Sequence, residues 1–283
     1  MSVWMFPGQG SQRVGMGEEL FGECPDWMEQ ADAIMGLSVR ELCLHDPRGL
    51  LNQTRYTQPA LYTVNALAWR VRRHKGEKPA WLIGHSLGEY NALLAAGVFD
   101  FAAGLRLVRR RGELMAAVQG GGMAAVIGLE EPRVRETLQQ EELRQVDIAN
   151  LNTKTQIVIA GPKEIVEQAC AALRKAGARR IVPLPVSGAF HSRAMRATQQ
   201  EFAQAIQQVS LNPPAIPVIA NATAQPYLRS AEAIAQTLVQ QIASPVRWVE
   251  SIQFLLRQGE EEFEEIGPGN VLAGLVRKIR ITD

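Results

Sequence analysis

One stretch near position 86 constrains the fold more than any other part of the chain. The apolar residues 81–83 lead into a Gly-x-Ser-x-Gly pentapeptide, Gly84–Gly88, and a helix-forming run follows it. This is the nucleophile-elbow pattern, in which a serine on a sharp strand-to-helix turn has an exposed hydroxyl. The flanking positions need glycine because Cβ atoms there would clash where the chain doubles back. The pattern therefore predicts an α/β fold with Ser86 as a nucleophile.

The same turn predicts a binding site for negative charge. It places the backbone N–H of Leu87 at a helix N-terminus, where donors have no partner within the helix, and such a donor can stabilise a developing oxyanion. The alternative is a chance match in an ordinary loop, since the chain contains 24 glycines. The apolar run before the pentapeptide and the helical run after it favour the elbow.

Length and charge exclude several classes of protein. The chain has 283 residues and a formal net charge of +1, so no overall field favours nucleic acid or a membrane surface. Cys24, Cys43 and Cys170 are scattered and lack the spacing of a disulfide framework or a metal site. The apolar N-terminus is interrupted at Pro7-Gly8, too early for a signal peptide, and no stretch is long enough to span a membrane. We expect a cytoplasmic protein.

Periodicity and turn residues predict a large α/β domain interrupted by a smaller one. The large domain, 1–122 and 191–283, is predicted to be α/β-hydrolase-like with a central, mostly parallel sheet. Its predicted helices cover 17–36, 38–45, 101–115, 191–210, 231–242 and 249–258, and another is capped by Thr57, has Pro59 in its first turn and runs through Trp69 to a basic link at 70–78. Gly120–Gly122 is the candidate hinge, and residues 123–190 have the β-α-β-β-α-β order of a ferredoxin-like α+β module. The active site is expected in the cleft between the two domains.

A serine nucleophile needs a base, and the chain offers four histidines. His85 is adjacent to Ser86 and leaves the elbow on another side, His74 lies in a basic segment, and His45 lies near a helix end. His191 lies where the smaller domain rejoins the larger, which makes it the candidate base, although a lone histidine is often structural. An α/β hydrolase places its histidine late in the chain, whereas the last histidine here, His191, lies well before the end. A two-member Ser–His arrangement therefore fits better.

Five separated motifs, in this order and approximate spacing, resemble the malonyl-CoA:acyl carrier protein transacylases. This family includes the acyltransferase domains of polyketide synthases, and the resemblance covers nearly the whole chain, the ferredoxin-like insertion included. The motifs are Phe6-Pro-Gly-Gln-Gly-Ser-Gln12, Gly84-His-Ser-Leu-Gly-Glu-Tyr90, Arg111-Gly112, Ala189-Phe-His191 and Gly267-Pro-Gly269.

The resemblance implies a catalytic pair without an acidic third member. Ser86 is then acylated by malonyl-CoA, and His191 is its base. A backbone carbonyl, here that of Ser244, orients the imidazole; many relatives have Asn at this position, and a backbone role tolerates the change. The N–H groups of Gln9 and Leu87 form the oxyanion hole.

The resemblance also implies the substrate-binding residues. Arg111 pairs with the free carboxylate of the malonyl group, a task that suits a guanidinium; without the resemblance it is a surface arginine like its neighbours. Phe190 fits the malonyl-selective pattern, since methylmalonyl-selective relatives carry a smaller serine there. Gln58, Asn150 and Asn152 match positions that line the acyl and pantetheine region, although each is also a common turn or cap residue.

The implied reaction moves a malonyl group from malonyl-CoA to the phosphopantetheine thiol of an acyl carrier protein, without a bound cofactor or a metal, in a monomer. The sequence segments 89–93, 121–128 and 244–248 most resemble stand-alone acyltransferases that serve polyketide synthases. Malonyl transfer in fatty-acid synthesis is the alternative. Carrier docking is expected to use basic residues such as Arg277, Lys278 and Arg280. Less favoured are a proofreading acyl hydrolase, whose relatives usually lack the arginine, a silent docking module and an unrelated serine esterase.

Overall fold

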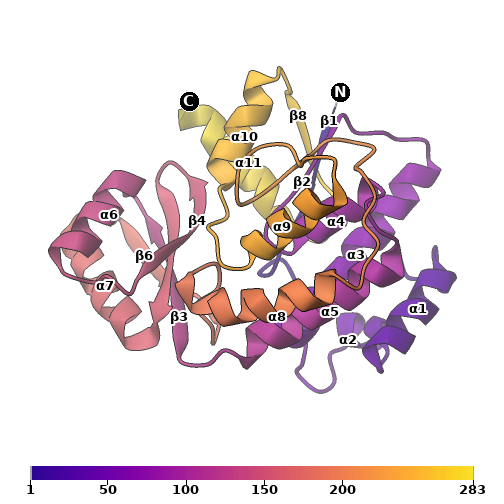
Figure 1. Ribbon diagram of the computed structural model, residues 1–283, viewed down its shortest axis with the longest axis horizontal. Helices are drawn as coiled ribbons and strands as arrows, with labels where there is room; N and C mark the ends of the chain where they lie inside the picture. Colours follow the sequence, from indigo (N-terminus) through magenta and orange to yellow (C-terminus); the bar gives the residue numbers. More distant parts are fainter. Residues whose placement is uncertain (1, 283) are drawn as a thin grey trace.

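The computed structural model describes residues 2–282. At its centre is a parallel sheet, whose strands all have their carboxyl ends along the same edge (Figure 1). Its order is β7 (Val218–Ile219), β2 (Trp81–Gly84), β1 (Ser2–Phe6) and β8 (Glu262–Glu265). β1 and β2 are almost entirely buried, as expected for parallel strands covered on both faces. Because Phe6 pairs with Gly84 in this register, the loop after β1 and the elbow after β2 begin side by side.

Helices pack around this sheet and form most of the larger unit. The long helix α3 packs against α5, and α4 lies over β1 and β2. The helices of this unit are α1 (Pro25–Met35), α2 (Val39–Leu44), α3 (Thr54–His74), α4 (Gly88–Ala95), α5 (Phe101–Ala117), α8 (Arg196–Ile206), α9 (Ala231–Gln241), α10 (Trp248–Arg257) and α11 (Val271–Thr282), with a short 3-10 turn at Arg193–Met195. No helix within residues 2–282 has the length and apolar character needed to cross a membrane.

A second, antiparallel sheet lies at one end of the molecule (Figure 1). Its strands follow the order β4 (Asp147–Thr153), β5 (Gln156–Pro162), β3 (Gly121–Ile127) and β6 (Arg180–Pro183), and α6 (Glu131–Gln140) and α7 (Lys163–Lys175) complete it. The connectivity is the predicted ferredoxin-like one. Val246 pairs with the edge of β4 through backbone hydrogen bonds to Ala149 and Leu151, both at 2.9 Å, and so joins the second sheet to the segment before α10.

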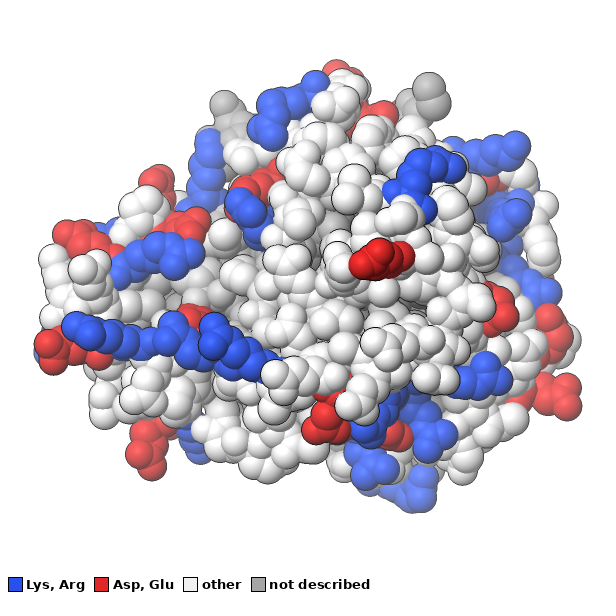
Figure 2. Space-filling model, viewed as in Figure 1, with Lys and Arg blue, Asp and Glu red and all other residues white. Residues whose placement is uncertain are grey.

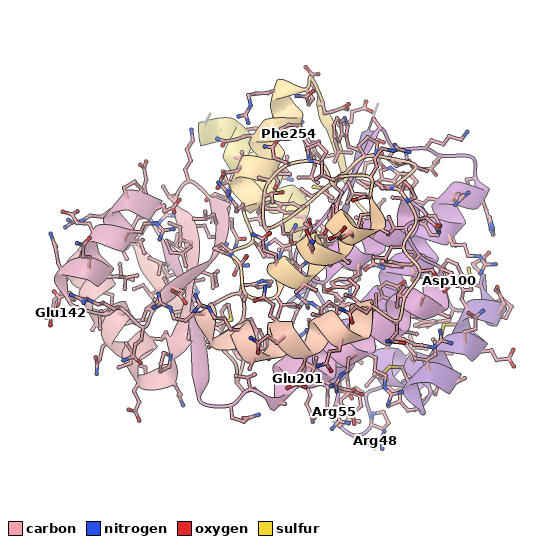
Figure 3. All side chains as sticks on the ribbon, viewed as in Figure 1. Arg48, Arg55, Asp100, Glu142, Glu201 and Phe254 are labelled. Atoms are coloured by element: carbon pink, nitrogen blue, oxygen red, sulfur yellow. The ribbon has the colours of Figure 1, made fainter. Side chains whose placement is uncertain are left out.

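Charged side chains lie mostly at the periphery. The middle of the face in Figure 2 is largely uncharged, with basic and acidic groups around its rim. In Figure 3 the labelled side chains of Arg48 and Glu142 lie at the outer edge of the molecule. The core below this face is continuous between the sheets, because one apolar cluster includes Val3 of β1 and Ile148 of β4.

Several predicted boundaries were wrong. The third helix begins at Thr54, and the hydroxyl of Thr57 donates inward to the carbonyls of Leu51 and Gln53 instead of capping an end. That helix continues to His74, so Arg72 and Arg73 occupy its last turn, where a positive charge interacts favourably with the helix dipole. The predicted link at 70–78 is therefore helical over its first half.

Two further helices are shorter than predicted, and the glycine hinge belongs to a strand. Residues 14–23 form turns and α1 starts only at Pro25; Gly15 and Gly17 in this segment have positive φ, which lies outside the right-handed helical region. The helix expected from His191 starts at Arg196, after the 3-10 turn. Gly121 and Gly122 are the first residues of β3 and pair with Pro162 and Gly161.

Candidate active site

The backbone around Ser86 has the geometry of an elbow. β2 ends at Gly84, Ser86 has a φ of 52°, and α4 begins at Gly88. A Cβ atom on Gly84 would lie 1.9 Å from the carbonyl carbon of Gly88, and one on Gly88 would lie 2.0 Å from the carbonyl oxygen of Phe6. Only glycine fits at either position, because any Cβ atom there clashes with the backbone, as the sequence predicts.

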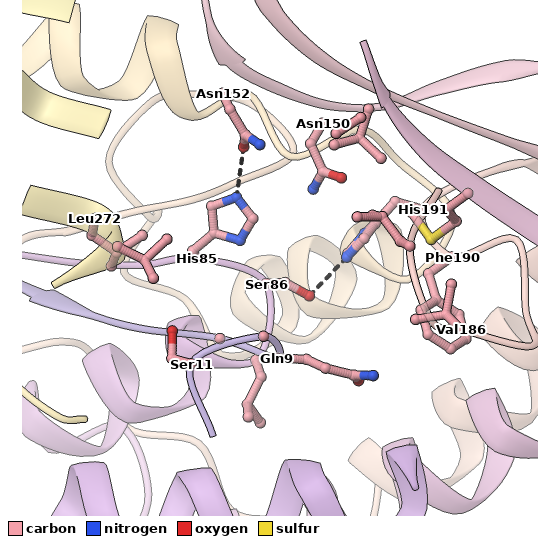
Figure 4. Close-up of a pocket in the computed structure, with 18 of the residues that line it drawn as sticks. Gln9, Ser11, His85, Ser86, Asn150, Asn152, Val186, Phe190, His191 and Leu272 are labelled. Carbon is pink, nitrogen blue, oxygen red and sulfur yellow. Dashed lines mark hydrogen bonds between the residues drawn. The ribbon is translucent and has the colours of Figure 1, made fainter. Parts of the chain in front are cut away.

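Ser86 and His191 face one another across the pocket (Figure 4). The Ser86 Oγ atom lies 2.7 Å from Nε2 of His191, whose Nδ1 is 3.0 Å from the carbonyl oxygen of Gln241 and 3.2 Å from that of Ser244. Because carbonyl oxygens only accept hydrogen bonds, we assign the ring proton to Nδ1, which leaves Nε2 free to accept the serine proton. The predicted Ser244 carbonyl is in place, and Gln241, which the sequence did not indicate, is slightly nearer.

His191 is held in its neutral form. Its side chain is buried, and burial together with the nearby charge of Arg111 lowers its pKa to about 3. A neutral imidazole is the form that a general base requires. His85, by contrast, points away from the nucleophile: its Nε2 lies 2.9 Å from Oδ1 of Asn152, and its ring packs near Trp248.

Two backbone N–H groups border the nucleophile without a partner. Within residues 2–282, neither the N–H of Gln9 nor that of Leu87 donates a hydrogen bond. The loop after β1 contacts the elbow, because a Cβ atom on Gly8 would lie 2.3 Å from the His85 carbonyl oxygen and 3.7 Å from the Leu87 nitrogen. The side chain of Gln9 is held by Thr54 at 3.2 Å. Free donors so placed suit an oxyanion hole.

Arg111 points inward, unlike its neighbours on α5. It is 1% exposed; its two terminal nitrogens donate to Oε1 of Gln58 at 2.7 Å, to Oγ of Ser86 at 3.0 Å and to Oε1 of Gln241 at 3.1 Å. Arg109 and Arg110 are exposed, as expected of a charge run. No acidic side chain within residues 2–282 forms a salt bridge with Arg111. Its guanidinium is therefore available to an anionic ligand beside the serine.

A cavity of about 280 Å³ lies over this group and contains the other predicted binding residues. Its lining comes from both sheets, with Met123, Ala125 and Val158 from the antiparallel one. Gln58, Asn150, Asn152 and Phe190 line it too. Asn152 is engaged by His85. The part of the chain that the structure describes contains no group of three or more His, Cys, Asp or Glu side chains suited to a metal ion.

The residues that fix the elbow from behind were not predicted. Asn221 accepts from the Ser86 N–H at 2.7 Å and donates to the Gly84 carbonyl at 2.7 Å. Gln241 donates to the carbonyl of Ser86 at 2.8 Å and to the carboxylate of Glu89 at 2.9 Å. These contacts join segments more than 130 residues apart, so no local pattern reveals them. Only Glu89 left a signal, as an acid in the otherwise uncharged helix α4.

Comparison with known proteins decides the family. The family model for the acyl transferase domain matches residues 3–279. The chain belongs to the acyl transferase family. The Ser86–His191 pair and the inward-facing Arg111 thus lie in an acyl transferase domain that extends over both sheets.

Curated relatives in the acyl transferase family resemble almost the whole chain. It is 49% identical over 282 residues to the polyketide biosynthesis malonyl CoA-acyl carrier protein transacylase PksC of Bacillus subtilis, covering 99% of this chain and 97% of PksC. It is 53% identical over 280 residues to the polyketide biosynthesis protein ThaF of Burkholderia thailandensis, where it spans 99% of this chain but only 24% of the relative.

Solved structures in the acyl transferase family share the fold. The malonyl CoA-acyl carrier protein transacylase of Burkholderia pseudomallei matches with a TM-score of 0.95 at 49% identity, over 100% of this chain and 99% of that one. A type II polyketide synthase acyl carrier protein in complex with its malonyl-transacylase, PlMCAT:AntF, matches with a TM-score of 0.94 at 39% identity, over 99% and 93%.

Proposed function

We propose that this protein transfers a malonyl group from malonyl-CoA, through a malonyl ester on Ser86, to the phosphopantetheine thiol of an acyl carrier protein, in the service of a polyketide synthase. The observation that carries the proposal is the double contact of Ser86, whose Oγ lies 2.7 Å from His191 and 3.0 Å from the buried guanidinium of Arg111. A nucleophile with a base on one side and a fixed cation on the other suits an acyl group that ends in a carboxylate.

In the first half-reaction Ser86 is acylated. His191 accepts the hydroxyl proton at Nε2 while Oγ attacks the thioester carbonyl, and the N–H groups of Gln9 and Leu87 stabilise the oxyanion. The intermediate collapses with cleavage of the carbon–sulfur bond, and coenzyme A leaves with the proton from His191. The bond that forms and the bond that breaks are both acyl bonds, so the reaction needs no resident cofactor.

In the second half-reaction the carrier's thiol replaces the serine. The phosphopantetheine thiol gives its proton to His191 and attacks the ester carbonyl, the carbon–oxygen bond breaks, and Ser86 recovers the proton. The carbonyl oxygens of Gln241 and Ser244 hold the imidazole in the same tautomer throughout. The same pair of residues thus acts in both directions, which is the basis of ping-pong transfer.

Arg111 is the proposed source of selectivity. An acyl group without a carboxylate leaves this buried cation unpaired by its substrate, a loss that typically costs a few kcal/mol. Phe190, buried beside His191, limits the room for a branched acyl group. The presence of Arg111 also disfavours a proofreading acyl hydrolase function, because relatives with that function usually lack this arginine.

The polyketide assignment rests on the relatives named for polyketide biosynthesis, PksC and ThaF, and the carrier partner is supported by the complex of a malonyl-transacylase with a polyketide carrier protein. The three cysteines are buried and free, in keeping with the proposed cytoplasmic location. Transfer rates to carrier proteins from both pathways test the assignment; a strong preference for the fatty-acid carrier contradicts it.

The decisive experiment for the chemistry is capture of the acyl-enzyme. The protein is incubated with radiolabelled malonyl-CoA, quenched in acid, and the label is located by peptide mapping. We expect one label on Ser86, its loss on addition of a carrier protein that bears phosphopantetheine, and no label in Ser86→Ala. Labelling of Ser86→Ala at the wild-type rate contradicts the mechanism.

A further inference from the structure

Behind Ser86 lies a carboxyl group that the mechanism above does not use. Glu89, in the first turn of α4, is 0% exposed. One carboxyl oxygen accepts from the hydroxyl of Tyr227, and the other accepts from Nε2 of Gln241 at 2.9 Å and the N–H of Asn221 at 3.2 Å. Burial of a carboxylate is costly unless a cation balances it, so the position of the nearest cation matters.

That cation is Arg111, and the amide of Gln241 connects the two groups. Its Oε1 accepts from Arg111 at 3.1 Å while its Nε2 donates to Glu89 at 2.9 Å. Among residues 2–282, Glu89 and Arg111 are the only Asp, Glu, Lys or Arg residues that are fully buried. The two opposite charges therefore lie in the same buried region, bridged by one amide group.

We propose that Glu89 is the resident counter-ion of Arg111 in the empty site, acting across the Gln241 amide, and that the malonyl carboxylate takes over this role while Glu89 takes up a proton from solvent. This inference rests on the proposed function, because it requires an acyl group with its own negative charge. Glu89 is a positioning residue in this scheme, since it acts on Arg111 and does not touch the substrate.

The charges around Glu89 favour such an exchange. Burial raises its pKa to about 7, and its hydrogen bonds and the charge of Arg111 offset this only in part. The ionisable groups that interact with it are Arg111 from α5, Tyr227 from the loop after β7, and Tyr90 beside it on α4; His191 faces Arg111 from the other side. A malonyl carboxylate on Arg111 adds a second negative charge and raises the pKa of Glu89 further.

The sign of the effect follows. As the pH falls through about 7, Glu89 becomes neutral and the charge of Arg111 becomes available to malonate, whereas at higher pH the ionised carboxylate competes for it. Two like charges about 10 Å apart at an effective dielectric constant of about 20 change an equilibrium by roughly tenfold. Malonyl-CoA should therefore bind roughly tenfold more weakly at about pH 8.5 than at about pH 6, with net proton uptake.

The test measures binding without turnover. The full chain with Ser86→Ala is titrated calorimetrically with malonyl-CoA and with acetyl-CoA across this pH range, in two buffers of different ionisation enthalpy. Acetyl-CoA carries the same nucleotide and phosphates but no acyl carboxylate, so the difference between the two ligands isolates the malonyl group. We expect pH dependence and proton uptake for malonyl-CoA beyond those of acetyl-CoA; equal behaviour of the two ligands overturns the inference.

Two variants of Glu89 and its partner sharpen the result. Glu89→Gln in the Ser86→Ala protein keeps the shape and an acceptor for Gln241 and Asn221; it should bind malonyl-CoA up to roughly tenfold more tightly at about pH 8.5 and lose the pH dependence. Tyr227→Phe removes a donor that lowers the pKa of Glu89, and it should move the transition to higher pH. If Glu89→Gln does not fold, the direction of the Tyr227→Phe shift decides.

Failure of this inference differs from failure of the proposed function. Suppose that the wild-type protein forms malonyl-Ser86, but the affinity for malonyl-CoA does not vary with pH and is unchanged in Glu89→Gln. The counter-ion role is then wrong and the transacylase assignment stands. If malonyl-CoA does not label Ser86 at all, both are wrong.

Discussion

Replacement of Arg111 by alanine should convert a malonyl-selective site into one that no longer distinguishes malonyl from acetyl groups. The guanidinium is 1% exposed, and the hydrogen bonds from its terminal nitrogens to Ser86, Gln58 and Gln241 fix it beside the nucleophile. Hydrogen bonds to charged groups contribute ~1.5–3 kcal/mol each. A bidentate grip worth ~3–5 kcal/mol corresponds to a loss in kcat/KM of about a hundred- to several-thousand-fold for malonyl-CoA.

The assay compares rates of acyl-Ser86 formation from malonyl-CoA and from acetyl-CoA under quench conditions. For Arg111→Ala we expect the malonyl rate to fall by this amount while the acetyl rate changes far less. Arg110→Ala, a neighbour on the same helix with a 46% exposed side chain, is the matched control and should leave both rates unchanged. A malonyl-to-acetyl ratio that stays at the wild-type value in a folded Arg111→Ala protein refutes the reasoning.

Three further outcomes follow from the same geometry. Because the pKa of His191 is lowered to about 3, the base stays neutral in weak acid, and kcat/KM for malonyl-CoA should show no decline near pH 6.5 when the pH falls from 8 to 5; a decline centred on the ordinary histidine pKa contradicts the assignment. Gly84→Ala should prevent folding or cost more than ~3 kcal/mol in urea unfolding, whereas Gly274→Ala, in α11 with open space around a Cβ atom, should stabilise by ~0.5–1 kcal/mol. Asn221→Ala leaves the Ser86 N–H without its acceptor, so it should lower the free energy of unfolding by ~1–3 kcal/mol and slow the acylation of Ser86. Wild-type stability together with a wild-type rate would show that the elbow does not depend on Asn221.

The sequence predicted the reacting residues better than the residues that hold them in place. Gly84–Gly88 between an apolar strand and a helical run indicates an elbow because the steric demand is local. His191 is the candidate base because each of the other three histidines has a local explanation. The role of Gln241 has no local sequence signal, because its backbone carbonyl contacts the imidazole and its side chain contacts Ser86 from 155 residues away. Asn221 and Glu89 meet only when segments more than 130 residues apart come together.

The boundaries that failed have equally physical causes. Thr57 is a good capping residue in isolation, yet it is buried in the first turn of α3 and its hydroxyl donates to the carbonyls of Leu51 and Gln53. The glycines at 15 and 17 interrupt a run that otherwise has helical composition. In both places tertiary packing or backbone conformation overrides the local preference.

The division of labour between the two sheets affects how the protein can be redesigned. The nucleophile and its oxyanion donors come from the loops after β1 and β2, which begin side by side because Phe6 pairs with Gly84. The carbonyl partners of the base come from the end of α9 and the residues just after it. Much of the wall opposite them, including Met123, Ala125 and Val158, comes from the antiparallel sheet. Random libraries confined to those wall positions can therefore change which acyl group is accepted, while the reacting atoms keep their places.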